Sequence, residues 1–194
     1  MYSSHGPPLD FARLADDRRL TPGVRAVAAG ARRRATRDGD RLVDTAHLLH
    51  SLLEGDPAAR EACDGGTGRM PRVLGYLVQR SIGYGLRWSG AVEETGAVPA
   101  LVPVPVPLPG PVAVPRPAGC VAGSGAVEEG GWSPAAAAAV RRAVHLARRR
   151  GRTRATGLDL LDALAADPAC RAREVLRAAG LDVSRYRGDG PVAS

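Results

Sequence analysis

Two histidines and an aspartate are the residues in this sequence that most resemble a metal site. Asp44, His47 and His50 follow one another at three-residue intervals, so around the start of a helix they would share one face. Two imidazoles and a carboxylate are a known metal set. The H-E-x-x-H pattern of zinc hydrolases is missing, however, and a histidine bonded to local backbone explains the spacing better. We therefore expect no metal and no other cofactor.

The residues needed for covalent or phosphoryl-transfer catalysis are missing or poorly placed. All 27 basic residues are arginine, which excludes a P-loop lysine, a Schiff-base lysine and a kinase-type ATP site. Ser124 lies in A-G-S-G-A within a Gly-rich stretch and not in a G-x-S-x-G turn. Cys63 has histidines in the same part of the chain, but a small buried thiol is the commoner role. We expect no enzyme activity.

Positive charge is concentrated near residue 150. The net charge is +7 and the isoelectric point about 10.3, which favours acidic partners. Arginines at the carboxyl end of a helix also stabilise the helix dipole, which gives a structural explanation of the cluster. Binding of nucleic-acid phosphates is the alternative, although only 4% of the residues are aromatic and able to stack on bases. The candidate cluster for an anionic partner is Arg148, Arg149, Arg150, Arg152 and Arg154.

Cysteine usage and hydropathy indicate a reducing, aqueous compartment. The cysteines, Cys63, Cys120 and Cys170, are odd in number and widely spaced, so neither a disulfide framework nor a zinc knuckle is indicated. The first ten residues lack the pattern of a secretion signal. The uncharged stretch 95–115 contains seven prolines and cannot form a membrane-spanning helix. We expect a cytoplasmic protein with no membrane contact.

The elements that must position these residues fall into two helical segments, 10–82 and 132–187, on either side of a linker. The linker, 83–131, has 10 glycines and 8 prolines among 49 residues, and its V-P-V-P-V-P-L-P run favours extended polyproline II. We expect the two segments to form one domain.

An internal repeat relates the two helical segments. An offset of 112 residues aligns Thr21-Pro22 with Ser133-Pro134, Gly39 with Gly151, and the leucines near 48–52 with those near 160–164, without a gap. Each copy has apolar residues at helical spacing between cap and stop signals, so about eight short helices are predicted. The predicted helix starts and caps are Thr21-Pro22, Thr45, Asp56-Pro57 and Met70 in the first copy, and Ser133-Pro134, Leu158, Asp167-Pro168 and a last turn near Tyr186 in the second.

The first copy, with L-T-P-G-V-R-A-V-A-A-G-A-R-R-R-A and then V-D-T-A-H-L-L-H-S-L-L-E-G, resembles the amino-terminal (Clp N, or Clp R) repeat domain of the Clp unfoldases. In the second copy, A-A-G-L-D-V-S-R-Y-R is similar to the closing turn and helix of that family. The resemblance implies an all-α, pseudo-twofold double repeat. Because the sequence has no lysine and no P-loop motif, we expect this domain to be free-standing, without the ATPase. It implies a protein- or peptide-binding module that acts as an adaptor, substrate receptor or ligand sink in Clp-dependent proteolysis. Its partners would be unfolded or tagged proteins, peptides, or a Clp ATPase or protease component.

The family motif also implies where a ligand would bind. In ClpC-type domains the glutamate of a threonine-glutamate-histidine motif, once per repeat, resembles a clamp for the guanidinium of phosphoarginine-tagged substrates. Here the glutamate positions hold Ala46 and Leu158, which offer no acceptor, and the second histidine is replaced by Asp159. The alternative function is that of a basic, helical, nucleic-acid-associated protein. The family-matched candidate ligand surface is Thr45, Ala46, His47, Gly157, Leu158 and Asp159.

Overall fold

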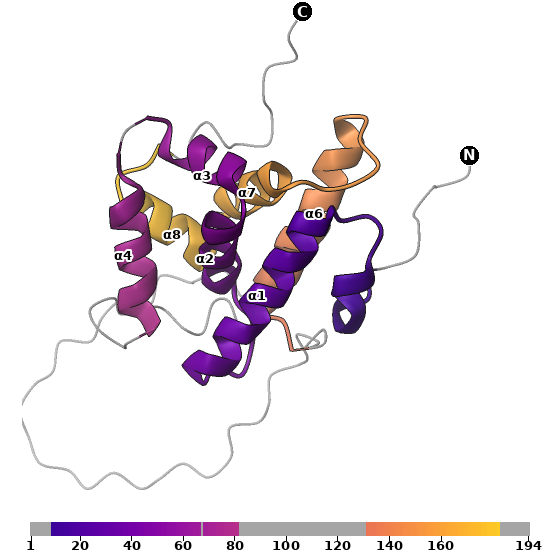
Figure 1. Cartoon of the computed structure of the whole chain (residues 1–194), viewed down its shortest axis with the longest axis horizontal. Coiled ribbons are helices and arrows are strands. Elements are labelled where there is room, and N and C mark those ends of the chain that lie inside the picture. Colours follow the sequence, from indigo (N-terminus) through magenta and orange to yellow (C-terminus); the bar gives the residue numbers. More distant parts are fainter. Residues whose placement is uncertain (1–8, 67, 82–130, 183–194) are drawn as a thin grey trace, which may run out of the picture.

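The computed structural model of this chain describes residues 9–66, 68–81 and 131–182, and in this part of the chain every regular element is a helix, as predicted (Figure 1). The linker at 83–130, the last turn expected near Tyr186 and Cys120 lie outside the described residues. The elements are η1 (Phe11–Asp16), α1 (Pro22–Asp38), α2 (Thr45–Gly55), α3 (Pro57–Asp64), α4 (Met70–Ser81), α6 (Pro134–Arg149), α7 (Gly157–Ala166) and α8 (Arg171–Ala178).

The two longest helices, α1 and α6, begin in the same way. The Thr21 hydroxyl accepts a hydrogen bond from the Val24 amide and the Ser133 hydroxyl accepts one from the Ala136 amide, and each cap is followed by proline at the first helical position. These groups satisfy first-turn amides that have no partner within a helix. Helix α1 ends at Gly39, whose φ of 75° is the left-handed conformation that favours glycine. All of these starts and stops agree with the sequence prediction.

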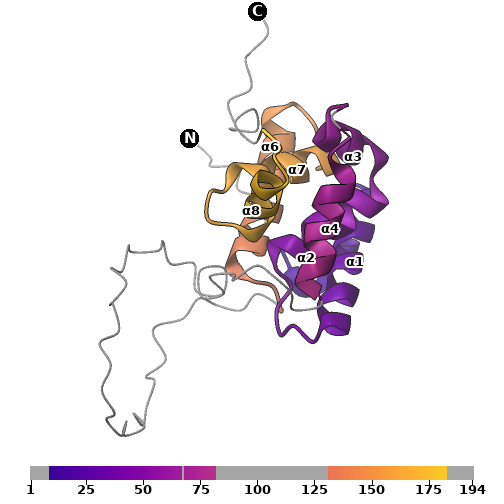
Figure 2. The ribbon, with the colours of Figure 1, turned by 90° about the vertical axis from the view of Figure 1, so that its left-hand side faces the viewer.

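The short helices α2 and α7 form the centre of the core. Leucines from both helices are fully buried: Leu48, Leu49 and Leu52 in α2, and Leu160, Leu161 and Leu164 in α7. Helix α1 packs on α2, α6 packs on α7, and α2 and α7 contact each other. Figure 2 shows α1–α4 on one side and α6–α8 on the other. One continuous hydrophobic cluster joins residues of both segments.

The short helices α3 and α8 pack on α2 and α7, and α8 begins later than predicted. Asp56-Pro57 opens α3 as expected. Asp167-Pro168 does not open α8, because the Asp167 carboxylate accepts from the Ala169 amide and closes a turn instead. Helix α8 begins at Arg171, with the Cys170 sulfur accepting from the amide of the third helical residue. Helix α3 packs against α7, and α8 packs against α2, so each covers a helix of the other segment.

Two isolated parallel β-bridges tie the segments together, Leu20 with Ala155 and Val43 with Trp132. The Thr21 amide donates to the Ala155 carbonyl at 3.0 Å, and the Ala155 amide donates to the Arg19 carbonyl at 2.7 Å. The other bridge has the same two bonds with the segments exchanged. The amide of Ser133 donates to Val43, and that of Val43 to Gly131, each at 2.9 Å. The residues of one bridge thus correspond to those of the other at the 112-residue offset.

Aromatic side chains close the end of the core beside η1. Trp132 is fully buried, and its ring lies 6.0 Å from that of Phe11. The Arg32 guanidinium lies 5.6 Å from the Trp132 ring and also donates to the Phe11 carbonyl. Helix η1 was not anticipated from the sequence. None of the described helices is both long and apolar enough to cross a bilayer.

Candidate functional site

The first half of the predicted ligand surface lies at the start of α2, where the cap is Asp44 and not Thr45 as predicted. The Asp44 carboxylate accepts from the His47 amide at 2.9 Å, and His47 Nδ1 accepts from the Asp44 amide at 3.1 Å. This reciprocal pair is a capping box in which histidine replaces the usual glutamate. Thr45 is the first helical residue, and its hydroxyl accepts from the buried Ala172 amide of α8 at 3.1 Å. Thr45 therefore joins two helices.

The second half lies at the start of α7 and has the same design. The cap is Thr156 and the helix begins at Gly157, one residue before the predicted start at Leu158. Asp159 takes the place of His47, and its Oδ2 accepts from the Thr156 amide at 2.9 Å and from the Thr156 hydroxyl at 2.8 Å. Gly157 packs against the Asp56 carboxylate, so closely that a side chain there would overlap it.

Most of these six candidate residues are not accessible to a ligand. Thr45 and Asp159 are fully buried, Ala46 and His47 are each 1% exposed, and Gly157 is buried. Leu158 is 38% exposed. Five of the six are therefore buried, and Leu158 alone among them offers a surface on which a ligand could bind.

A different trio from the predicted one brings possible metal ligands together. His50 is not part of this trio, and its Nε2 lies 3.3 Å from Glu54 Oε1. Among the described residues, the carboxylates of Asp40 and Asp44 and the imidazole of His47 have ligand atoms within 4.8 Å of one another. Because Nδ1 of His47 accepts from an amide, the proton of the neutral ring lies on Nε2, which is 3.1 Å from Asp40 Oδ2. A metal ion at this ring would have to break the capping box.

The arginine cluster divides into two groups. Arg150 Nη1 and Arg152 Nη2 contact the same buried oxygen, Asp159 Oδ1, at 2.7 and 2.5 Å. The hydrogen bond from Arg150 to Asp162 is the main cause that raises the pKa of this guanidinium above its ordinary value. The other members, Arg148, Arg149 and Arg154, are exposed and form no ion pair with any residue that the structure describes.

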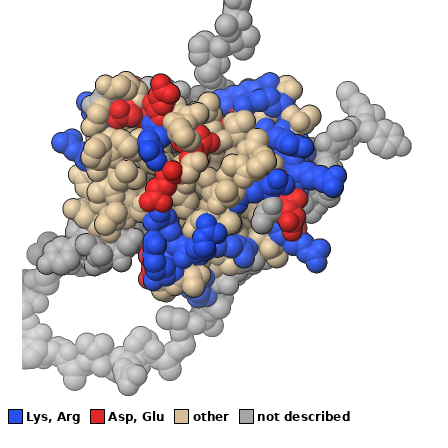
Figure 3. Space-filling view, viewed as in Figure 1, with Lys and Arg blue, Asp and Glu red and all other residues tan. Residues whose placement is uncertain are grey.

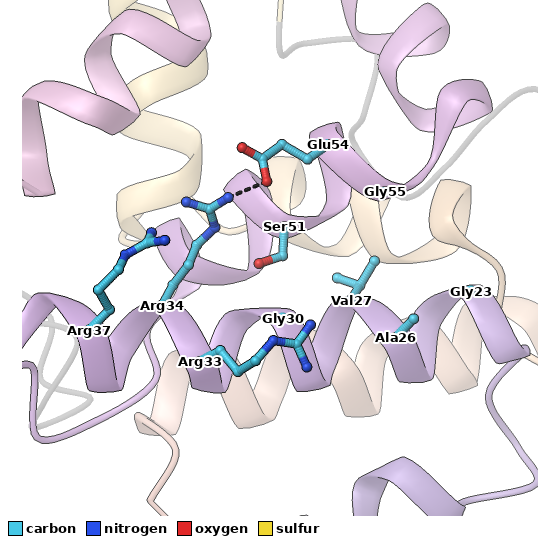
Figure 4. Close-up of a pocket in the computed structure, with 10 residues that line it drawn as sticks. All are labelled: Gly23, Ala26, Val27, Gly30, Arg33, Arg34, Arg37, Ser51, Glu54 and Gly55. Carbon is cyan, nitrogen blue, oxygen red and sulfur yellow. Dashed lines mark hydrogen bonds and ion pairs between the residues drawn. The ribbon is translucent and has the colours of Figure 1, made fainter.

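Residues that the sequence prediction did not select form a groove between α1 and α2 (Figure 4). Its volume is about 410 Å³. Arg33, Arg34 and Arg37 reach it from α1, and Ser51 and Glu54 from α2. Figure 3 shows basic side chains gathered over the lower part of α1. The signal in the sequence was Ser51, a polar residue within the apolar L-L-H-S-L-L run.

His50 precedes Ser51 on α2, and its Nε2 lies 3.3 Å from the carboxylate of Glu54, which lines the groove. Its burial is the main cause that lowers the pKa of the imidazole below the ordinary 6.5, and the positive charge of Arg34 lowers it further. Glu54 opposes this shift. The carboxylate of Glu54 also bonds Arg34, so the buried histidine and the arginine compete for one acid.

The chain was also compared with known proteins. No protein-family model matches it, and no curated protein sequence matches it.

Proposed function

We propose that this chain is a non-enzymatic protein- or peptide-binding module of the Clp amino-terminal type, folded as a double Clp N repeat. It would act as an adaptor, substrate receptor or ligand sink in Clp-dependent proteolysis. The observation that carries the proposal is the crossed pair of β-bridges, in which the hydrogen bonds of Leu20 with Ala155 reappear between Val43 and Trp132 at the 112-residue offset. Two copies of one helical unit, each completing the other, are what the resemblance implies.

Matching helix caps support the same proposal. Thr21 and Ser133 cap α1 and α6, and the capping boxes of α2 and α7 also correspond at the offset of 112. The chain has no lysine, so it has no Clp-type ATP site of its own. A module of this kind would bind protein segments and pass them to, or keep them from, a separate motor.

The accessible part of the candidate surface decides how the proposal is tested. Leu158 and Val78 are the exposed large hydrophobic residues of the described chain, at 38% and 49% exposure, and Val78 lies on α4 outside the candidate surface. Fluorescence anisotropy with a labelled unfolded-protein peptide should give binding that Leu158→Ser weakens and Val78→Ser leaves unchanged. Equal losses from both variants, or no binding by the unmodified protein, would contradict the proposal.

Nucleic-acid binding is a second candidate, favoured by Arg148, Arg149 and Arg154, which are exposed and have no ion pair with any described residue. A labelled DNA duplex should then bind with an affinity that falls steeply with salt, since each phosphate contact releases counterions. Replacing Arg148 and Arg149 by glutamine should reduce that salt slope by about two units if both contact phosphate. Tight binding of the duplex alone would replace the first proposal by this one.

A further inference from the structure

The groove between α1 and α2 contains a buried hydroxyl with no hydrogen-bond partner among the residues that the structure describes. Ser51 is 7% exposed, and its Oγ forms no hydrogen bond with any described group. Figure 4 shows the oxygen turned toward α1 at Gly30, where a side-chain carbon would lie only 3.2 Å from it. Buried hydroxyls are nearly always hydrogen-bonded, so an unpaired one that lines an open groove points to a missing polar partner.

The groove around this hydroxyl is lined by more arginines than acidic residues. Arg34 is anchored by a hydrogen bond to Glu54. Arg33 is exposed and has no ion pair within the described chain, and Arg37 is 66% exposed with Nε 3.6 Å from Asp38 Oδ1. Three guanidinium groups therefore face one carboxylate inside the groove. Guanidinium groups bind phosphate oxygens through paired N–H donors, and a serine hydroxyl can donate to a further oxygen.

The other segment shows that helix packing does not require these residues. At the 112-residue offset, Arg34 corresponds to Leu146 and Ser51 to Ala163, both buried where α6 packs on α7. Glu54 corresponds to Ala166. The pair α6–α7 thus packs with apolar side chains at positions where α1–α2 has polar and charged ones. Packing of the two helices therefore does not explain Arg34, Ser51 and Glu54.

We propose that the groove between α1 and α2 binds a phosphoryl group, as free phosphate or as a phosphomonoester. Its oxygens accept from the Ser51 hydroxyl and from the guanidinium groups of Arg33 and Arg37. Arg34, fixed by Glu54, supplies a third positive charge. The proposal goes beyond the peptide-binding function and does not depend on it, because Leu158 is not among the residues that line the groove.

Isothermal titration of the full chain with inorganic phosphate, and separately with O-phosphoserine, tests the proposal. Sodium chloride keeps the ionic strength constant. Both ligands carry the group that the groove would recognise. Tighter binding of phosphoserine would identify a phosphorylated side chain as the source, and equal or weaker binding would identify free phosphate. Absence of saturable binding by either ligand would overturn the proposal.

Three variants distinguish phosphate binding in the groove from non-specific attraction of phosphate to a basic protein. Ser51→Ala introduces the residue that the other segment carries at this position, so the fold should be retained, and we expect about tenfold weaker binding. Arg37→Gln should also weaken binding about tenfold. Arg142→Gln is the matched control, because it removes the same charge from an exposed position of α6 that does not line the groove, and it should change affinity less than twofold. Equal losses from Arg37→Gln and Arg142→Gln, or no effect of Ser51→Ala, would refute the site.

Discussion

Replacing Gly157 by alanine is expected to destabilise this protein, although replacing a glycine within a helix by alanine ordinarily stabilises a protein. A Cβ atom at Gly157 would lie 1.9 Å from Asp56 Oδ2 and 2.7 Å from Asp56 Cγ, which is shorter than any non-bonded contact. The Asp56 side chain must therefore rotate away. Its Oδ1 then loses the 3.0 Å hydrogen bond from the Ala59 amide, which caps the start of α3. The change thus acts on a helix of the other segment.

The expected magnitude follows from two opposing contributions. Loss of a helix cap costs about 0.5–2 kcal/mol. Replacing glycine by alanine returns about 0.4–1 kcal/mol through the unfolded chain. The Leu52 Cδ1 atom, 3.1 Å from the new Cβ, must also shift, so we expect a net loss of about 1 kcal/mol in the free energy of unfolding.

Urea unfolding followed by far-ultraviolet circular dichroism measures this change, and a second background identifies its cause. In a protein carrying Asp56→Ala the obstructing carboxylate and its cap are already gone, so Gly157→Ala should there be neutral or stabilising. The reasoning would be refuted by an equal loss in both backgrounds, or by a stabilising Gly157→Ala in the unmodified protein.

Three further predictions concern buried polar groups. Asp159→Asn should lower the free energy of unfolding by about 2 kcal/mol in urea titrations, because the buried carboxylate holds Arg150 and the cap of α7; an unchanged midpoint would contradict this. Thr45→Val should cost about 1–2 kcal/mol by thermal unfolding, since the Ala172 amide loses its acceptor, whereas Thr45→Ser should cost less. Burial lowers the pKa of His50, so below about pH 6.5 the unfolded chain binds a proton more readily than the folded chain, and the free energy of unfolding decreases as the pH decreases. Measured from pH 7.5 to 5, this decrease should be smaller in His50→Gln. Identical pH dependence in both proteins would argue against this cause.

Helix positions could be predicted wherever the signal is local. Thr21-Pro22 and Ser133-Pro134 combine a side-chain acceptor with a residue that lacks the amide hydrogen, and both begin helices as expected. The cap of α2 was predicted one residue too late because Asp44 and Thr45 are adjacent and both suit a cap. The choice between them depends on α8, whose Ala172 amide uses the Thr45 hydroxyl. The two residues of this contact are 127 positions apart, so the sequence around Thr45 does not indicate it.

Similar sequences also led to different local structures. Asp56-Pro57 and Asp167-Pro168 have the same letters, but the first opens a helix and the second a turn that ends at Cys170. The candidate site depends even more on tertiary packing. A polar residue such as Asp159 looks accessible in a sequence, and only the approach of Arg150 and its own cap explain why it is fully buried.

The crossed β-bridges also determine which amide hydrogens report on separation of the two segments. The amides of Thr21 and Val43 are bonded to carbonyls of the second segment, and those of Ser133 and Ala155 to carbonyls of the first. Each of these bonds joins the two segments, so separation of the segments breaks all four. In a hydrogen–deuterium exchange experiment these four amides would therefore lose protection together, whichever segment unfolds first. These amides precede the helices and lie outside the helical hydrogen-bond ladders, so their exchange reports directly on separation of the two segments.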